Sequence, residues 1–253
     1  MLTDLIAAAA AALSFLTVLP APRTEWTPAR LRYFPVVLPL AGLVVGGLGA
    51  LLFAGFSCWG ASATLRSVLM ALFYLFITGG LHMDGLMDTC DAVFSRQGRE
   101  ERLRILSDAS AGAFAVMGCV TVLLLKIGAF SELLGVERIN VSAALTFLPV
   151  YSRLGVGVLF YLPFAREDGL ALTLGKARLP AGRLLLLAGG AALTAAAISF
   201  LGPRWLVVPL TGGVFLHFYK RWCVRVFGGI TGDLLGAFVE LSETLMLLAL
   251  VFA

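Results

Sequence analysis

Residues 79–91 read GGLHMDGLMDTCD and place three carboxylates within eight positions. Asp84, Asp88 and Asp91 stand at positions i, i+4 and i+7, so an α-helix brings all three to one face. The apolar run 68–77 comes before this segment and is typical of the end of a membrane helix. The segment therefore predicts a helix that carries an acidic cluster at a membrane surface.

Three like charges on one helix face repel one another, and each is costly to keep ionised next to lipid. The sequence places no basic residue after them before Arg96, so a bound cation is the simplest compensation. Mg²⁺ or Mn²⁺ suits carboxylate oxygens and keeps water or substrate phosphate in its other positions. A solvated acidic helix face is the alternative interpretation of the same residues.

The composition predicts an all-α, polytopic integral membrane protein. The chain has 253 residues, of which 60% are hydrophobic and 13% charged. A soluble domain has about 25% charged residues, so the whole chain, residues 1–253, is expected to form a single membrane-embedded domain. Its four cysteines form no CxxC pair and no zinc spacing, and we expect them to stay reduced.

Eight apolar spans are predicted, because about 20 helical residues cross the hydrocarbon core. They cover residues 5–20, 36–57, 65–81, 111–134, 141–163, 183–201, 204–219 and 234–252. The first and seventh spans are short, and the count is seven if the first lies in the membrane interface. In the second span, Gly42, Gly46 and Gly49 form a stripe that is typical of close helix packing.

The basic residues predict the orientation of these spans. Fourteen of the nineteen lie in alternate loops: Arg23, Arg30, Arg32, Arg96, Arg99, Arg102, Arg104, Arg166, Lys176, Arg178, Arg183, Lys220, Arg221 and Arg225. The other loops hold one basic residue each, namely Arg66, Arg138 and Arg204. By the positive-inside rule, the loops rich in basic residues face the cytoplasm.

Two of these loops contain further candidate residues. Asp108 precedes an apolar span, where it is either a helix cap or a fourth acidic ligand or base. Arg166 and Lys176 are suited to a phosphorylated substrate, since Arg binds phosphate in a bidentate manner and Lys as a point charge. An ordinary basic flank of a membrane helix is the alternative for Lys176.

The last loop reads FGGITGDLLG over residues 227–236. Gly228, Gly229 and Gly232 allow the backbone to approach an anion closely at the start of a helix. Asp233 and Glu240 stand at i and i+7 and share a face of that helix.

Glu240 lies within an apolar span, and an acid in that position is a functional hypothesis. Arg153, inside the fifth span, is the expected partner either of Glu240 or of substrate phosphate.

Acids, glycine turns and basic residues thus converge on one membrane surface. Such a site suits a divalent cation and a diphosphate, with an Asp accepting the proton of an attacking hydroxyl, and predicts phosphoryl-type or nucleotidyl-type group transfer. A transporter is the rival class, because Lys126, Arg153, Glu240 and Glu243 are ionisable residues within spans. A degenerate scaffold that organises other enzymes is a third alternative.

Four motifs resemble those of the cobalamin synthase family (adenosylcobinamide-GDP ribazoletransferase). They are SFLTVLPAP at 14–22, TGGLHMDGLMDTCD at 78–91, AREDGL at 165–170 and GGITGDLLGA at 228–237. The resemblance covers the chain from end to end and keeps the order of the motifs. Ala92 departs from the glycine that the family usually has after the third Asp, and Ser110 stands where it usually has a basic residue.

The resemblance implies a reaction in which α-ribazole or its 5′-phosphate attacks adenosylcobinamide-GDP, GMP leaves, and adenosylcobalamin or its 5′-phosphate forms. It implies Mg²⁺, with Mn²⁺ as a substitute, and chemistry similar to that of CDP-alcohol phosphotransferases. It also implies a multi-pass protein of the bacterial inner membrane with its site facing the cytoplasm. Expected partners are the two substrates, the lipid bilayer and other corrinoid-assembly enzymes, and no nucleic acid.

These implications complete the set of expected site residues. Asp84, Asp88 and Asp91 are the expected metal ligands and, together with Asp233, the expected catalytic residues. The expected substrate-binding residues are His82, Asp108, Arg153, Arg166, Lys176, Gly228, Gly229, Gly232 and Glu240.

Overall fold

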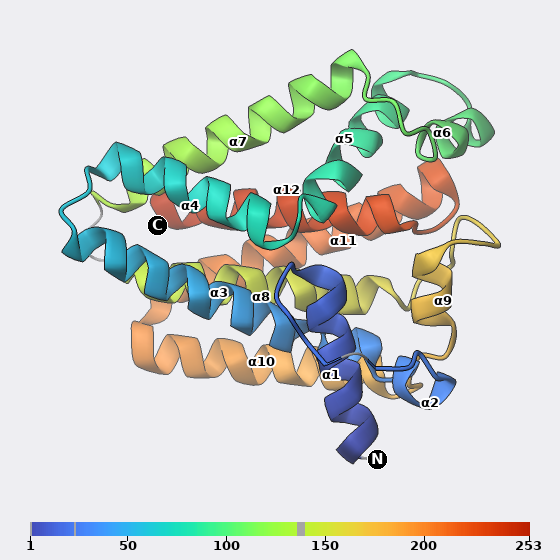
Figure 1. Ribbon diagram of the computed structural model, residues 1–253, viewed down its shortest axis with the longest axis horizontal. Helices are drawn as coiled ribbons and strands as arrows, with labels where there is room; N and C mark the ends of the chain where they lie inside the picture. Colours follow the sequence, from blue (N-terminus) through green and yellow to red (C-terminus); the bar gives the residue numbers. More distant parts are fainter. Residues whose placement is uncertain (1, 23, 136–139) are drawn as a thin grey trace.

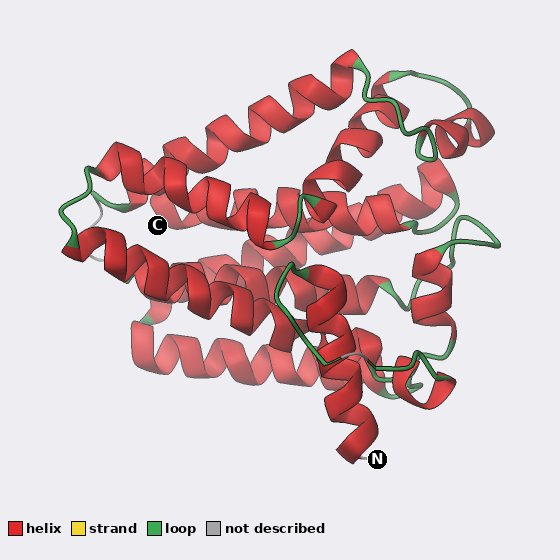
Figure 2. Ribbon diagram, in the orientation of Figure 1, coloured by secondary structure: helices red, strands yellow, loops and turns green. Residues whose placement is uncertain are grey.

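The computed structural model describes residues 2–22, 24–135 and 140–253. The elements along the chain are α1 (Leu2–Leu16), α2 (Pro28–Leu31), α3 (Phe34–Cys58), α4 (Ala63–Ile77), α5 (Leu81–Phe94), α6 (Arg99–Ile105), α7 (Ala113–Leu133), α8 (Val141–Leu159), α9 (Leu170–Lys176), α10 (Gly182–Leu201), the 3₁₀ helix η1 (Pro203–Leu206), α11 (Val207–Phe227) and α12 (Gly232–Val251). Within these described residues, no strand is formed, and the predicted all-α class is confirmed (Figure 2).

Five described helices are long and apolar enough to cross a membrane: α3, α7, α8, α10 and α12. The bent pair α4 and α5 makes a sixth if the two are counted as one span. The predicted count of eight is not confirmed. With 15 residues, α1 is too short to cross about 30 Å of hydrocarbon. The predicted seventh span lies in α11, which runs on through the basic residues Lys220, Arg221 and Arg225.

The bundle is arranged around α12, which packs against α5, α7, α8 and α11. The short helices α2, α6 and α9 lie together at one end of the molecule, and the C-terminus lies at the opposite end (Figure 1). The predicted alternation of basic and other loops therefore corresponds to the two ends of the bundle. Arg23 and Arg138 lie outside the described residues.

The predicted third span ends earlier than expected, because α4 stops at Ile77 and the chain bends by 89° into α5. Gly79 and Gly80 form the turn with φ angles of +61° and +77°, which are left-handed values that favour glycine. This bend directs the acidic helix away from the axis of α4 (Figure 1).

Two glycines of the α3 stripe, Gly42 and Gly46, lie against α8, and the third, Gly49, lies against Tyr74 of α4. A Cβ on Gly42 would lie 2.4 Å from the Pro149 carbonyl oxygen, and one on Gly46 would lie 2.4 Å from that of Thr146. Real Cβ atoms do not approach so closely, so the two backbones touch at these glycines. The neighbouring Gly47 faces open space.

We expect Gly46→Ala to lower the free energy of unfolding by about 1–3 kcal/mol, because the added methyl group forces α3 away from α8. Gly47→Ala is the matched control and should be neutral or slightly stabilising, since alanine favours helix over glycine. The thermal unfolding midpoints of the purified proteins in detergent measure both effects. Equal midpoints for the two variants would contradict the close α3–α8 contact.

Candidate active site

The acidic helix α5 is held against the first turn of α12. A Cβ on Gly85 would lie 2.6 Å from the Asp233 carbonyl oxygen and 2.9 Å from its Cα atom. The two backbones are therefore in direct contact at this point. The contact places the acids of α5 beside Asp233, which lies in the first turn of α12.

The acidic side chains form one electrostatic group. Asp84 is exposed, and Asp88, Asp91 and Asp233 are half-buried. The negative charge of Asp88 is repelled by three neighbouring carboxylates, most strongly by Asp84 and then by Asp233 and Asp91. Across the described residues, no three His, Cys, Asp or Glu side chains are arranged closely enough to hold a metal ion. The predicted metal site thus has the expected donors, which do not converge on one point.

Asp91 makes a contact that the sequence did not predict. Its two carboxylate oxygens accept hydrogen bonds from the backbone amides of Gly112, at 2.6 Å, and Ala115, at 2.9 Å. These amides belong to the first turn of α7, so Asp91 on α5 caps a different helix. This cap leaves Asp91 less free than Asp84 or Asp88 to turn toward a ligand.

Asp108 does not cap α7, so the cap interpretation of this residue is wrong. Its Oδ1 accepts a hydrogen bond from the Ser110 amide at 3.0 Å, within an exposed turn before Gly112. That hydrogen bond holds the pKa of Asp108 below its usual value. The departure at Ser110 therefore lies in this turn.

The loop that follows α8 is paired with the loop that precedes α12. The Ala165 amide donates to the Ile230 carbonyl, and the Ile230 amide donates to the Pro163 carbonyl, both at 2.9 Å. Gly229 permits this approach, because a Cβ there would lie 2.4 Å from the Pro163 oxygen. The pairing brings Arg166, next in the chain, to the start of α12.

Arg166 joins three parts of the site. Its guanidinium donates a hydrogen bond to the Leu103 carbonyl of α6 and attracts the carboxylate of Asp233. Thr231 caps α12 by accepting from the Leu234 amide and donates to Asp233 at 3.3 Å. Arg166 thus lies beside the acids, where the sequence analysis expects a phosphate-binding cation.

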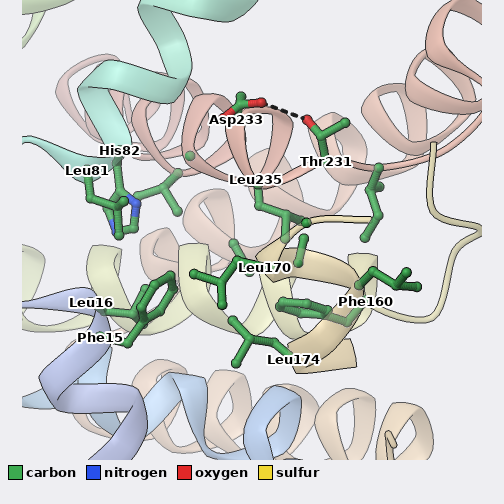
Figure 3. Close-up of a pocket in the computed structure, with 18 of the residues that line it drawn as sticks. Phe15, Leu16, Leu81, His82, Phe160, Leu170, Leu174, Thr231, Asp233 and Leu235 are labelled. Atoms are coloured by element: carbon green, nitrogen blue, oxygen red, sulfur yellow. Dashed lines mark hydrogen bonds between the residues drawn. The ribbon is translucent and has the colours of Figure 1, made fainter. Parts of the chain in front are cut away.

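A cavity of about 270 Å³ opens beside these groups. Most of its wall is apolar and comes from α1, α3, α8, α9 and α12, while Asp84, Arg166, Asp168 and Asp233 lie at its polar part. Figure 3 shows His82 projecting from α5 toward Phe15 and Leu16 of the cavity wall. The cavity and the acidic group therefore form one continuous site.

Some of the predicted site residues line this cavity, and others lie elsewhere in the structure. The cavity lining includes His82, Asp84, Arg153, Arg166, Gly232 and Asp233. Lys176 is exposed at the end of α9 and does not line the cavity. Gly228 ends α11 with a φ of +82° and packs against the guanidinium of Arg99. Glu240 is buried within α12, away from the cavity lining.

The buried ionisable residues pair with one another. Lys126 of α7 donates to Glu240 at 2.5 Å and lies 3.7 Å from Glu243, both on α12. Arg153 of α8 donates to Glu243 and not to Glu240, so the first of the two partners expected for Arg153 is wrong. Ser152 also donates to Glu243, at 2.8 Å. Two cations and two anions thus neutralise each other between three helices.

The aromatic wall of the cavity has no role that the sequence pattern predicts. Phe15 lies in the motif at 14–22, which the resemblance identified, whereas Phe34 and Phe160 lie outside all four motifs. Helical periodicity predicts that such residues are buried, but it does not predict which helices meet.

Comparison with known proteins gives a consistent result. A family model described as cobalamin-5-phosphate synthase matches residues 8–251. The adenosylcobinamide-GDP ribazoletransferases of Escherichia coli (strain K12 / DH10B) and Shigella flexneri are each 34% identical over 95% of this chain and 97% of their own length. The enzyme of the same name from Clostridium botulinum is 32% identical over 91% of both chains. No solved structure matches.

The buried charge network gives a testable prediction about stability. Lys126→Met leaves Glu240 without its closest partner, and breaking one side of a buried ion pair typically costs about 3–5 kcal/mol. The double variant Lys126→Met/Glu240→Gln removes both charges and should recover part of that loss. Unfolding of the purified proteins in detergent measures the difference. A double variant less stable than Lys126→Met would contradict the pairing.

Proposed function

The chain belongs to the cobalamin-5-phosphate synthase family, and we propose that it joins α-ribazole, or its 5′-phosphate, to adenosylcobinamide-GDP with release of GMP. The family makes it a cobalamin synthase of late cobalamin biosynthesis. The observation that carries the proposal is the contact of α5 with α12, which brings Asp84, Asp233 and Arg166 together in the lining of one cavity. Asp88 lies close enough to Asp84 and Asp233 to be repelled by both.

The proposed reaction assigns a task to each of these groups. A ribose hydroxyl oxygen of the acceptor forms a bond to the corrinoid-side phosphorus. The bond from that phosphorus to the bridging oxygen breaks, and GMP leaves. Arg166 would bind the diphosphate, since a guanidinium matches phosphate oxygens in a bidentate geometry. Asp233, attracted by Arg166 and hydrogen-bonded by Thr231, would accept the hydroxyl proton.

We also propose that Asp84 and Asp88 hold Mg²⁺, whereas Asp91, the third acid of the predicted set, is engaged by the amides of Gly112 and Ala115. Carboxylate oxygens are the donors that Mg²⁺ prefers, and the repulsion around Asp88 favours a cation there. Such an ion, when bound, would neutralise charge on the phosphoryl oxygens. Asp91 would then keep α5 and α7 in register through its contacts with Gly112 and Ala115.

Two observations support a site that faces the cytoplasm of a bacterial inner membrane. The site lies at the end of the bundle that carries the loops rich in basic residues (Figure 1). The named relatives come from bacteria. The C-terminus, at the opposite end, would then lie outside.

Asp88→Asn keeps the size of the side chain and removes its charge. We expect it to abolish GMP release from adenosylcobinamide-GDP in the presence of α-ribazole, because metal-assisted charge stabilisation contributes several kcal/mol. Mg²⁺ titrations of the rate, with product identified by mass, measure the effect. Glu132→Gln, an exposed acid at the far end of α7, is the control and should keep the native rate.

We expect Asp88→Asn to remain folded in detergent, so that its loss of GMP release reflects the missing charge and not unfolding. Partial recovery of the rate at high Mg²⁺, or with Mn²⁺, would mark weakened metal binding. A native rate with unchanged Mg²⁺ dependence in Asp88→Asn would instead make the acidic group a solvated helix face.

A further inference from the structure

The cavity beside the acids has a composition unlike that of a phosphate site. Its walls are largely apolar and include the rings of Phe15, Phe34 and Phe160. The Phe34 ring lies 6.1 Å from that of Phe15 and 6.0 Å from that of Phe160, in edge-to-face geometry with both. Such a wall suits an uncharged aromatic group. The charged residues of the lining are Asp84, Arg153, Arg166, Asp168 and Asp233.

One polar atom in this apolar surrounding has no protein partner. Within the described residues, His82 Nε2 is buried and makes no hydrogen bond, and the side chain is 5% exposed. Most buried polar atoms are satisfied, because an unmade hydrogen bond costs about 1–3 kcal/mol. Figure 3 shows that this imidazole projects toward Phe15 and Leu16, into the part of the cavity with the apolar wall.

The position of His82 is set by the backbone. A Cβ on Gly236 would lie 3.2 Å from both the Cα atom and the carbonyl oxygen of His82, so α5 and α12 are closely packed here. Arg153, a cationic residue of the lining, already donates to Ser152 and Glu243. The free imidazole nitrogen is therefore presented to whatever occupies the cavity.

We propose that this cavity binds the aromatic base of the acceptor nucleoside, with His82 Nε2 hydrogen-bonded to the nucleoside. The inference rests on the proposed function, in which the acceptor is α-ribazole, a benzimidazole nucleoside. The size and polarity of the cavity favour the acceptor nucleoside over the two parts of the other substrate, the corrinoid and the guanosine. A corrin macrocycle exceeds about 270 Å³, and a guanine base needs several polar partners that the apolar wall does not provide.

This arrangement also orients the acceptor. A base held against the wall formed by Phe15, Phe34 and Phe160 leaves its ribose toward Asp84 and Asp233, which also line the cavity. The attacking hydroxyl is then next to the carboxylates, and the corrinoid and guanosine portions stay outside the cavity. The cavity is thereby the determinant of which lower base is accepted, favouring apolar benzimidazoles over the more polar adenine.

Two variants with matched controls test the inference on the full-length protein in detergent. His82→Phe removes the hydrogen-bonding nitrogen, and His82→Gln restores a polar group at a similar reach. Leu170→Trp narrows the cavity at a residue that is 51% exposed, so the fold should tolerate it. The controls are His217→Phe, on an exposed histidine of α11, and Leu184→Trp, on a 70% exposed leucine of α10.

The variants should change the Michaelis constant of one substrate and not that of the other. We expect His82→Phe and Leu170→Trp each to raise KM for α-ribazole about tenfold, which corresponds to ~1.4 kcal/mol, and to leave KM for adenosylcobinamide-GDP unchanged. His82→Gln should recover part of the loss. Leu170→Trp should raise KM more for α-ribazole, whose benzimidazole carries two methyl groups, than for the riboside of unsubstituted benzimidazole. Both controls should match the native protein.

Equilibrium binding of α-ribazole, followed by its benzimidazole fluorescence with and without adenosylcobinamide-GDP, separates this inference from the proposed function. A protein that binds α-ribazole through His82 but releases no GMP would support the cavity assignment and contradict the proposed reaction. A raised KM for the corrinoid alone, equal changes for both substrates, or native α-ribazole affinity in His82→Phe would each overturn the assignment.

Discussion

The backbone contact between α5 and α12 determines the geometry of the whole site. No side chain fits between Gly85 and Asp233, so the two helices approach as closely as their backbones allow. Such a contact prevents α5 from sliding along α12, because any shift brings a residue larger than glycine against a carbonyl oxygen. It fixes Asp84 and Asp88 relative to Asp233, and at Gly236 it also fixes His82.

Charges buried deeper in the bundle support the same pair of helices. Glu240 and Glu243 attach α12 to Lys126 on α7 and Arg153 on α8, and Asp91 attaches α5 to the first turn of α7. In a lipid environment these polar contacts are directional, whereas apolar packing alone has little preference between neighbouring helices. Arg153 belongs to both the network and the cavity lining, so the network and the substrate site share a residue.

Much of the site could be predicted because its residues are close in sequence. The i, i+4, i+7 spacing placed three acids on one helix face. The partners of those residues lie on distant segments and were missed. Nothing in the spacing shows that Asp91 caps a helix beginning at Ala113, or that Arg153 selects Glu243 over Glu240.

The predicted count of eight spans is not confirmed, for a related reason. Hydropathy alone does not distinguish a helix that crosses the bilayer from one that lies along or within its interface. The first predicted span became the short helix α1, which supplies Phe15 to the cavity. The third ends at Ile77, where the chain bends by 89° into the acidic helix, so its last predicted residues, 78–81, form the turn and the start of α5.

The measurement that tests this account most directly is the rate of GMP release from adenosylcobinamide-GDP supplied with α-ribazole and Mg²⁺, compared between the native chain and Gly85→Ala. We expect the native protein to release GMP and Gly85→Ala to lose about a hundredfold in rate, because a displacement of about 1 Å disrupts the catalytic geometry. Gly128→Ala, where a Cβ meets no atom within 4 Å, should keep the native rate. A native chain that releases no GMP, or a folded Gly85→Ala variant with the native rate, would contradict the account.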